Sequence, residues 1–270
     1  MSTTEKLRSI NKSGKFICVG LDTDPKKIPH HLSGSKKPVI EFNKKIIEFT
    51  KDLAAAYKLN LAFYESEGTV GLENLEETLS FIPGNVLTIA DGKRGDIGNT
   101  SKMYAQSIFD HFKFDSATLN PYMGKDSLEP FLDYQNKLNF ILVLTSNPSS
   151  SDFQKQRLDS GIYLYQEVLK KIHEWNTAEN CGIVFGATNL SELKDNMKNI
   201  GDLPLLIPGV GAQGGNLLDT AGALFANNKN SFLINVSRGI IQKSSGEDFA
   251  DAARNELIGL NDKISKIISS

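Results

Sequence analysis

Short, nearly uninterrupted apolar runs alternate with longer segments of mixed polarity along the whole chain. Apolar runs of this length, without a polar residue at every second position, are typical of strands buried on both faces of a parallel sheet. The pattern predicts eight strands, at residues 16–21, 57–63, 86–90, 116–119, 140–145, 182–186, 204–207 and 231–236.

The segments between the predicted strands have the apolar spacing of amphipathic helices. The first surrounds Ile40, Ile47 and Leu53, and the later ones cover residues 72–81, 100–112, 127–134, 162–175, 190–197, 216–225 and 247–258. Regular alternation of strand and helix implies a parallel sheet, and eight repeats imply closure into an α/β fold, the (β/α)₈ TIM barrel. No linker divides the sequence, so we expect residues 1–270 to form a single domain.

An open, doubly wound sheet is the competing architecture for the same alternation. Such a sheet often carries a G-x-G-x-x-G turn after its first strand. The chain has Gly20-Leu21-Asp22-Thr23-Asp24 at that point, which favours the barrel.

Composition excludes several classes of partner. The chain has 270 residues, 40% of them hydrophobic and 23% charged, and a net charge of −2, so no basic surplus points to nucleic acid. No apolar run approaches the roughly 20 residues that span a bilayer, so we expect no membrane partner.

Cys18 and Cys181 lie in apolar runs and the N-terminus lacks an apolar signal segment. We therefore expect reduced core cysteines and a cytoplasmic protein.

Asp91, Lys93 and Asp96 form a dense group of charges after the third predicted strand, in the pattern D-x-K-x-x-D. Residues two apart in an extended chain share a face, so Asp91 and Lys93 are expected side by side. The following turn would carry Asp96 away. On its own, the group also fits a solvated turn with a surface ion pair, which would contribute little to stability.

Polar side chains follow several other predicted strands. Asp22 ends the first, Lys58 and Asn60 lie two apart on the second, and Thr145-Ser146-Asn147 follows the fifth. In a TIM barrel the carboxyl ends of all strands meet at one mouth, where the catalytic residues sit. The barrel therefore favours a working site over a solvated turn for the charged motif.

The last two predicted strands end in residues suited to phosphate. TIM barrels frequently bind phosphate with the loops that follow these strands. A glycine-rich loop at residues 208–215 lets the backbone approach a ligand closely, and Gln213 adds an amide donor. Arg238 follows the eighth strand with a fork of donors that matches phosphate oxygens. We expect a phosphate site here.

The segment D-G-K-R-G-D-I-G-N-T at residues 91–100 resembles the signature of the orotidine 5′-monophosphate decarboxylase family. Similar motifs come in the family's order: Leu21-Asp22, Lys58, the glycine-rich loop and Ser237-Arg238-Gly239. Thr145-Ser146-Asn147-Pro148 resembles the longer-chain, bacterial-type branch. The resemblance runs from about residue 16 to about residue 238 and so covers all eight predicted units.

The resemblance implies loss of CO₂ from orotidine 5′-monophosphate to give UMP, the last step of de novo pyrimidine synthesis, without a cofactor or a metal ion. It makes Lys93 the proton donor to C6 of the pyrimidine and places Asp91 against the departing carboxylate. It implies that Lys58 contacts the ribose side and pairs with the aspartates, and that Asp96 completes a charged row.

The resemblance also implies a homodimer with shared active sites, in which Asp96, Ile97 and Thr100 reach the neighbouring subunit's site. The remaining substrate-binding positions that it implies are Asp22 and Asn60 for the ribose, Thr145 and Ser146 for the base, and Pro208, Gln213, Arg238 and Gly239 for the phosphate and the base edge.

Two other functions fit parts of the pattern. A related barrel with D-x-K-x-x-D uses Mg²⁺ on a sugar phosphate such as a keto-gulonate or hexulose phosphate, but the Lys58 ammonium would repel a cation. A non-catalytic nucleotide-binding protein on the same fold would gain little from confined charges. A fused orotate phosphoribosyltransferase is not expected, because the barrel uses nearly the whole chain.

Overall fold

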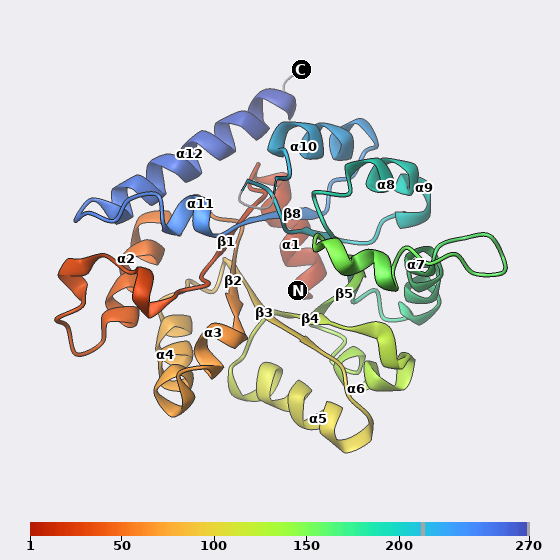
Figure 1. Ribbon diagram of the computed structural model, residues 1–270, viewed down its shortest axis with the longest axis horizontal. Coiled ribbons are helices and arrows are strands. Elements are labelled where there is room, and N and C mark those ends of the chain that lie inside the picture. The colour runs from red at the N-terminus through yellow and green to blue at the C-terminus, as the bar shows by residue number, and fades with distance from the viewer. Residues whose placement is uncertain (212–213, 269–270) are drawn as a thin grey trace.

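The chain forms a closed barrel of parallel strands with helices around it, in a computed structural model that describes residues 1–211 and 214–268 (Figure 1). The strands follow one another around the barrel in chain order, and the first also pairs with the eighth. The predicted (β/α)₈ barrel is confirmed, and the alternative of an open sheet is wrong.

Eight strands occur in the described part of the chain, each within or overlapping a predicted apolar run. They are β1 (Ile17–Gly20), β2 (Ala56–Asn60), β3 (Leu87–Arg94), β4 (Ser116–Leu119), β5 (Leu138–Leu144), β6 (Cys181–Phe185), β7 (Leu205–Ile207) and β8 (Phe232–Val236).

Two strand ends differ from the prediction in ways that matter for the site. The second strand was expected to reach residue 63 but ends at Asn60, because the Asn60 side chain accepts the N–H of Ala62 at 3.2 Å and caps a helix there. The third was expected to end at residue 90 but continues to Arg94. The charged motif therefore begins inside a strand.

Most of the helices lie around the barrel, as Figure 1 shows. In the described residues they are α1 (Thr3–Lys12), α2 (Pro38–Thr50), α3 (Leu61–Glu65), α4 (Gly68–Ser80), α5 (Gly98–Gln106), α6 (Glu129–Leu132), α7 (Leu164–Trp175), α8 (Leu190–Asp195), α9 (Met197–Ile200), α10 (Leu217–Ala226), α11 (Arg238–Ile241) and α12 (Phe249–Ile268). Single helical turns complete the set: η1 (Pro25–Lys27), η2 (His30–Leu32), η3 (Ser107–His111), η4 (Pro121–Met123), η5 (Lys125–Ser127) and η6 (Pro148–Asp152).

Each predicted helical segment contains a helix, with corrected boundaries. The segment 100–112 begins earlier and divides into α5 and the π-helical turn η3. The segment 190–197 divides into α8 and α9, and the last helix runs on to Ile268. The prediction missed α1, whose polar sequence is instead stabilised by a capping box between Ser2 and Glu5.

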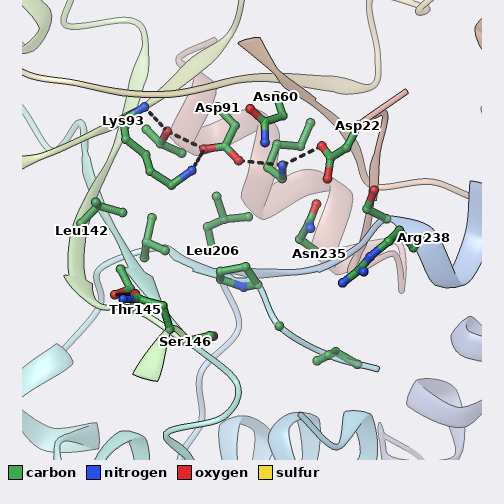
Figure 2. Close-up of a pocket in the computed structure, with 18 of the residues that line it drawn as sticks. Asp22, Asn60, Asp91, Lys93, Leu142, Thr145, Ser146, Leu206, Asn235 and Arg238 are labelled. Carbon is green, nitrogen blue, oxygen red and sulfur yellow. Dashed lines mark hydrogen bonds and ion pairs between the residues drawn. The ribbon is translucent and has the colours of Figure 1, made fainter. Parts of the chain in front are cut away.

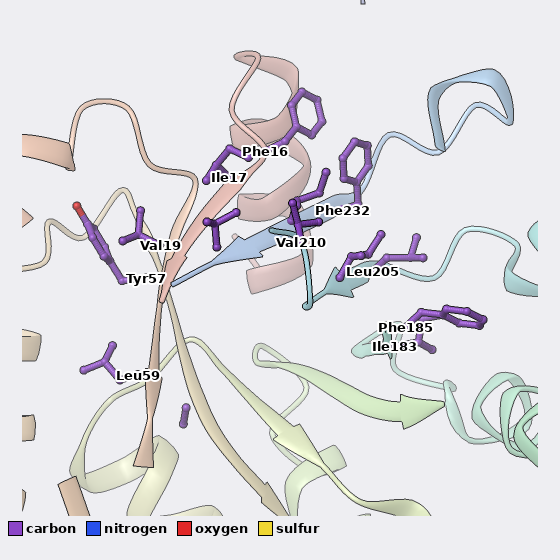
Figure 3. Close-up of a cluster of buried hydrophobic side chains, with 14 of the residues drawn as sticks. Phe16, Ile17, Val19, Tyr57, Leu59, Ile183, Phe185, Leu205, Val210 and Phe232 are labelled. Carbon is purple, nitrogen blue, oxygen red and sulfur yellow. The ribbon is translucent and has the colours of Figure 1, made fainter. Parts of the chain in front are cut away.

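Apolar side chains form two clusters. The larger lies between strands and helices and includes Tyr57, Phe185 and Phe232 (Figure 3). The smaller gathers alternate strand residues such as Ile89 and Phe140, and it includes Leu7 of α1. In Figure 1 α1 lies at the centre of the ring, so it closes one end of the barrel.

The inner face of the barrel changes from apolar to charged toward the carboxyl ends of the strands. On β3 the buried Ile89 is followed at every second position by Asp91 and Lys93, and on β2 Ala56 is followed by Lys58. Because side chains alternate along a strand, one apolar position fixes the direction of the charged positions beyond it. The smaller cluster thus lies inside the barrel next to the charged residues and fixes the strands that carry them.

Both cysteines are buried and free, as predicted. Burial raises the pKa of Cys181 to about 12, and burial also raises the pKa of Cys18, which keeps both thiols protonated at neutral pH. Within the described ranges, no helix has both the length and the apolar character needed to cross a membrane.

Candidate active site

A pocket of about 300 Å³ opens at the carboxyl ends of the strands, where the sequence predicted it. Every strand, or the residues just after it, contributes to the lining. Of the predicted site residues, those in the lining are Asp22, Lys58, Asn60, Asp91, Lys93, Thr145, Ser146, Pro208, Arg238 and Gly239.

Four charged side chains of alternating sign form a row along one wall (Figure 2). The Lys58 ammonium lies 2.7 Å from one carboxylate oxygen of Asp91 and 3.4 Å from a carboxylate oxygen of Asp22. The Lys93 ammonium lies 2.7 Å from the other oxygen of Asp91. The prediction that Asp91 and Lys93 lie side by side is confirmed. Two carboxylates and two ammonium groups leave the row formally neutral.

The row keeps its charges because each buried group has an opposite partner. Burial alone would lower the pKa of Lys58, but Asp91 and Asp22 outweigh it and raise this pKa above its ordinary value. Burial alone would raise the pKa of Asp91, but Lys58 and Lys93 hold it well below its ordinary value. The Lys93 side chain is 49% exposed against 5% for Lys58, so Lys93 presents its ammonium to the pocket.

The end of the row toward β4 is held by a residue that the sequence did not single out. Thr118 accepts a hydrogen bond from the Lys93 backbone N–H at 3.0 Å and donates one to Asp91 at 2.9 Å. The available signal was a hydroxyl residue within the short strand β4, which also contains Ser116. Its partners depend on the register between β3 and β4, which the sequence alone does not fix.

The predicted phosphate residues Pro208, Arg238 and Gly239 line the same pocket. Arg238 begins α11 two residues after the end of β8, and Arg238 and Asn235 both line the pocket (Figure 2). Among the described residues no carboxylate forms an ion pair with its guanidinium. Gly209 and Gly211 have φ of 98° and 77°, a backbone that favours glycine and gives the loop its turn. Gln213 lies outside the described residues.

The part of the pocket that the resemblance assigns to the base combines apolar and polar groups. Leu142, Val184 and Leu206 provide apolar lining. The Ser146 hydroxyl is buried and has no hydrogen-bond partner among the described residues, so it is available to a ligand. The Thr145 hydroxyl instead already donates to the side-chain oxygen of Asn147 at 2.6 Å. A planar ring with polar edges fits this combination.

Asn235 is a second pocket residue that the sequence prediction missed. Its side chain is buried on β8 and lines the pocket. Its side-chain amide oxygen has no hydrogen-bond partner among the described residues. In the sequence, the available signal for a pocket contact was a polar residue within an otherwise apolar strand run. Buried polar groups without partners are rare in folded proteins, which points to a ligand contact.

Asp96, Ile97 and Thr100 do not line the pocket of their own chain. Asp96 accepts the backbone N–H of Ile97 at 2.8 Å, just before α5. The predicted row of Lys58, Asp91, Lys93 and Asp96 is therefore not assembled within one chain. Asp22 supplies the second carboxylate instead, because the end of β1 lies beside Lys58 on β2.

Within residues 1–211 and 214–268, no cluster of three or more His, Cys, Asp or Glu side chains is placed to hold a metal ion. The carboxylates of Asp22 and Asp91 both turn to the Lys58 ammonium that lies between them. Within the row, the negative charges of Asp22 and Asp91 are balanced by the ammonium groups of Lys58 and Lys93.

Comparison with known proteins agrees with this geometry. The family model described as "Orotidine 5'-phosphate decarboxylase / HUMPS family" matches residues 15–253. The orotidine 5′-phosphate decarboxylase of Flavobacterium johnsoniae is 44% identical, covering 100% of this chain and 99% of the relative. That of Porphyromonas gingivalis is 46% identical, covering 95% and 94%. The solved OMP decarboxylase of Leishmania donovani has a TM-score of 0.82 and 35% identity, covering 97% and 99%. The chain belongs to the orotidine 5′-phosphate decarboxylase / HUMPS family.

Proposed function

We propose that this protein removes CO₂ from orotidine 5′-monophosphate and releases UMP. The observation that carries the proposal is the neutral row of Asp22, Lys58, Asp91 and Lys93, with one ammonium turned to the pocket. Relatives that are 44% and 46% identical carry the name of this decarboxylase.

The reaction needs fixed positive charge at one carbon. When the bond from C6 to the carboxylate breaks, its electron pair stays on C6 as a poorly delocalised carbanion, and CO₂ leaves neutral. Enzymes lower the barriers of the slowest reactions by about 23 kcal/mol or more, and fixed charges supply much of this. Lys93 stabilises the carbanion and then transfers an N–H proton to C6. Lysine can do this at neutral pH, whereas arginine holds its proton too firmly.

Asp91 acts on the ground state of the same step. It stays ionised, and we place it next to the substrate carboxylate. Two like charges about 4 Å apart repel by about 4 kcal/mol at an effective dielectric constant near 20. This repulsion disappears as CO₂ forms. Lys58 and Lys93 hold Asp91 in place while the repulsion acts.

The remaining assignments come from the family resemblance, and the residues that they concern line the pocket. Asp22 and Asn60 serve the ribose, Ser146 and Thr145 the base, and Arg238, Pro208 and Gly239 the phosphate and the base edge. The role of Gln213 rests on the sequence resemblance alone. Phosphate binding is remote from C6, yet its energy can position the ring and so raise the rate.

Treatment with EDTA is expected to leave the conversion of orotidine 5′-monophosphate unchanged, because a lysine occupies the centre of the row. The fall in substrate absorbance is followed with and without EDTA, and with Mg²⁺ restored as a control. A rate that EDTA abolishes and Mg²⁺ restores would favour the rival, a magnesium-dependent sugar-phosphate enzyme. A nucleotide-binding protein without activity would bind UMP and convert nothing.

We further propose a homodimer in which Asp96, Ile97 and Thr100 enter the partner's pocket. Ile97, Tyr122 and Phe153 are 60%, 75% and 61% exposed. Tyr122 follows Asn120, whose backbone lies against Gly95, next to Asp96. The rings of Tyr122 and Phe153 lie 6.0 Å apart, centroid to centroid. Exposed apolar groups that gather in this way mark interaction surfaces.

Mixing two inactive variants tests the shared site. Lys93→Ala and Asp96→Ala alone are expected to be nearly inactive. After dissociation and reassembly together, half of the dimers are mixed, and each mixed dimer has one intact site, so about one quarter of the wild-type activity returns. Mixed Lys93→Ala and Asp91→Ala, both altered on the same side of the site, serve as the control and stay inactive. No recovery in the first mixture contradicts the proposal.

We also propose that the barrel acts as a single domain in the cytoplasm. The two cysteines are free and buried, which suits a reducing compartment.

A further inference from the structure

We propose that Thr118 is a positioning residue, whose hydroxyl sets the geometry of Asp91 and Lys93 for the decarboxylation proposed above. Thr118 lies on β4 and its side chain is buried. Its single hydroxyl contacts both residues of the motif, which no other side chain in the described part of the chain does by hydrogen bonding.

These two contacts use the only proton that the hydroxyl can donate. It accepts the backbone N–H of Lys93 at 3.0 Å and donates its own proton to Asp91 at 2.9 Å. A hydroxyl has one proton to donate, so none is left for the substrate. Thr118 lines the pocket. It acts on the reaction through Asp91 and Lys93.

The backbone of Lys93 explains why such a contact is needed. Lys93 has φ of 46°, in the left-handed region that long side chains rarely adopt. Pairing between β3 and β4 shifts here, since Ala90 faces Ala117 but Arg94 faces Leu119. The ladder therefore skips Lys93, and the Thr118 side chain replaces the missing backbone partner. Irregular pairing of this kind often redirects a side chain next to an active site.

Thr118 also completes the support of the Asp91 carboxylate. One carboxylate oxygen receives the Lys58 ammonium at 2.7 Å. The other receives the Lys93 ammonium at 2.7 Å and the Thr118 hydroxyl at 2.9 Å. The hydroxyl is the uncharged, backbone-anchored member of the three. Without it, Asp91 can rotate with the flexible Lys93 chain, and a Lys93 backbone N–H is left unpaired.

Thr118→Val keeps the shape of the side chain and removes the hydroxyl, whereas Thr118→Ser keeps the hydroxyl. We expect Thr118→Val to lower kcat by about 10- to 100-fold, because small misplacements of reacting groups cost this much. UMP affinity should change by less than about threefold, since valine has nearly the same size and shape as threonine. Thr118→Ser should stay within about threefold of the wild-type kcat.

Thr88→Val is the matched control. Thr88 lies at the other end of β3, and its hydroxyl also accepts a backbone N–H, from Asp115 at 3.0 Å, and donates to a carboxylate, that of Asp115 at 3.3 Å. This variant loses the same two kinds of hydrogen bond away from the pocket. It should lower Tm about as much as Thr118→Val and leave kcat at the wild-type value.

The proposal is overturned if Thr118→Val keeps kcat within about twofold of wild type, or if Thr118→Ser is as slow as Thr118→Val. If Thr118→Val does not fold, Thr118→Ala is measured with the same expectations for kcat and UMP affinity. A wild-type protein that does not decarboxylate the substrate at all refutes the proposed function instead, so the two failures are distinct.

Discussion

Replacing Lys93 by alanine is expected to abolish nearly all turnover while UMP still binds. The substitution removes both the charge that stabilises the C6 carbanion and the proton that replaces CO₂. Proton transfer by a positioned group contributes about 10²- to 10⁴-fold, and removal of one electrostatic donor costs about 10²- to 10³-fold. We therefore expect a loss of at least about 10⁴-fold in kcat. The fold should persist, because Asp91 keeps its ion pair with Lys58.

A second variant of Lys93 separates the effect of its charge from that of its proton, and a surface lysine provides a control. Lys93→Arg keeps a positive charge near Asp91 but yields its proton far less readily, so it should also be nearly inactive. Lys125→Ala removes an exposed lysine that pairs with Glu129 on the surface at 3.4 Å, and should behave as wild type. The readouts are kcat and the Kd for UMP by calorimetry. Residual turnover by Lys93→Ala above about one per cent of wild type would refute the proton-donor role.

Replacing Arg238 by alanine is expected to lower kcat/KM by about 10- to 100-fold. A hydrogen bond to a charged group contributes about 1.5–3 kcal/mol, and no described carboxylate competes for this guanidinium. If Arg238 acts on the phosphate, the loss should vanish with orotidine, which has no phosphate. The measurement is kcat/KM for both substrates with wild type and variant. Equal losses on both substrates would place Arg238 elsewhere in the reaction.

Arg8→Ala is the control for this experiment. Arg8 is an exposed arginine of α1, at the other end of the barrel from the mouth. Its removal changes the net charge of the protein by the same amount as Arg238→Ala. An unchanged kcat/KM for Arg8→Ala would show that the effect of Arg238 is local and not a loss of general attraction for a phosphate.

The barrel and much of its mouth could be predicted from the sequence because their signals are local. Eight apolar runs fix eight strands, and alternation within a strand puts Asp91 and Lys93 on one face. Position at the carboxyl end of a strand was enough to bring Asp22 and Arg238 into one pocket.

The missed features depend on contacts between distant parts of the chain. Thr118 meets Asp91 only through the shifted register of β3 and β4, and Asn235 faces the pocket only once the barrel closes. The end of β2 depended on the capping role of Asn60, which looks like any polar strand residue in the sequence. Asp96 was placed in the row by the family resemblance, and in the structure it does not line the pocket of its own chain. The turn after β3 carries it away from Asp91 and Lys93, as the order of residues in the motif predicted.

The most direct test gives the purified protein orotidine 5′-monophosphate labelled in the carboxylate and counts both products, with EDTA present throughout. The account predicts one labelled CO₂ for each UMP formed, at a rate that Lys93→Ala does not approach. Label that stays in the nucleotide, with no UMP above the uncatalysed background, would contradict it.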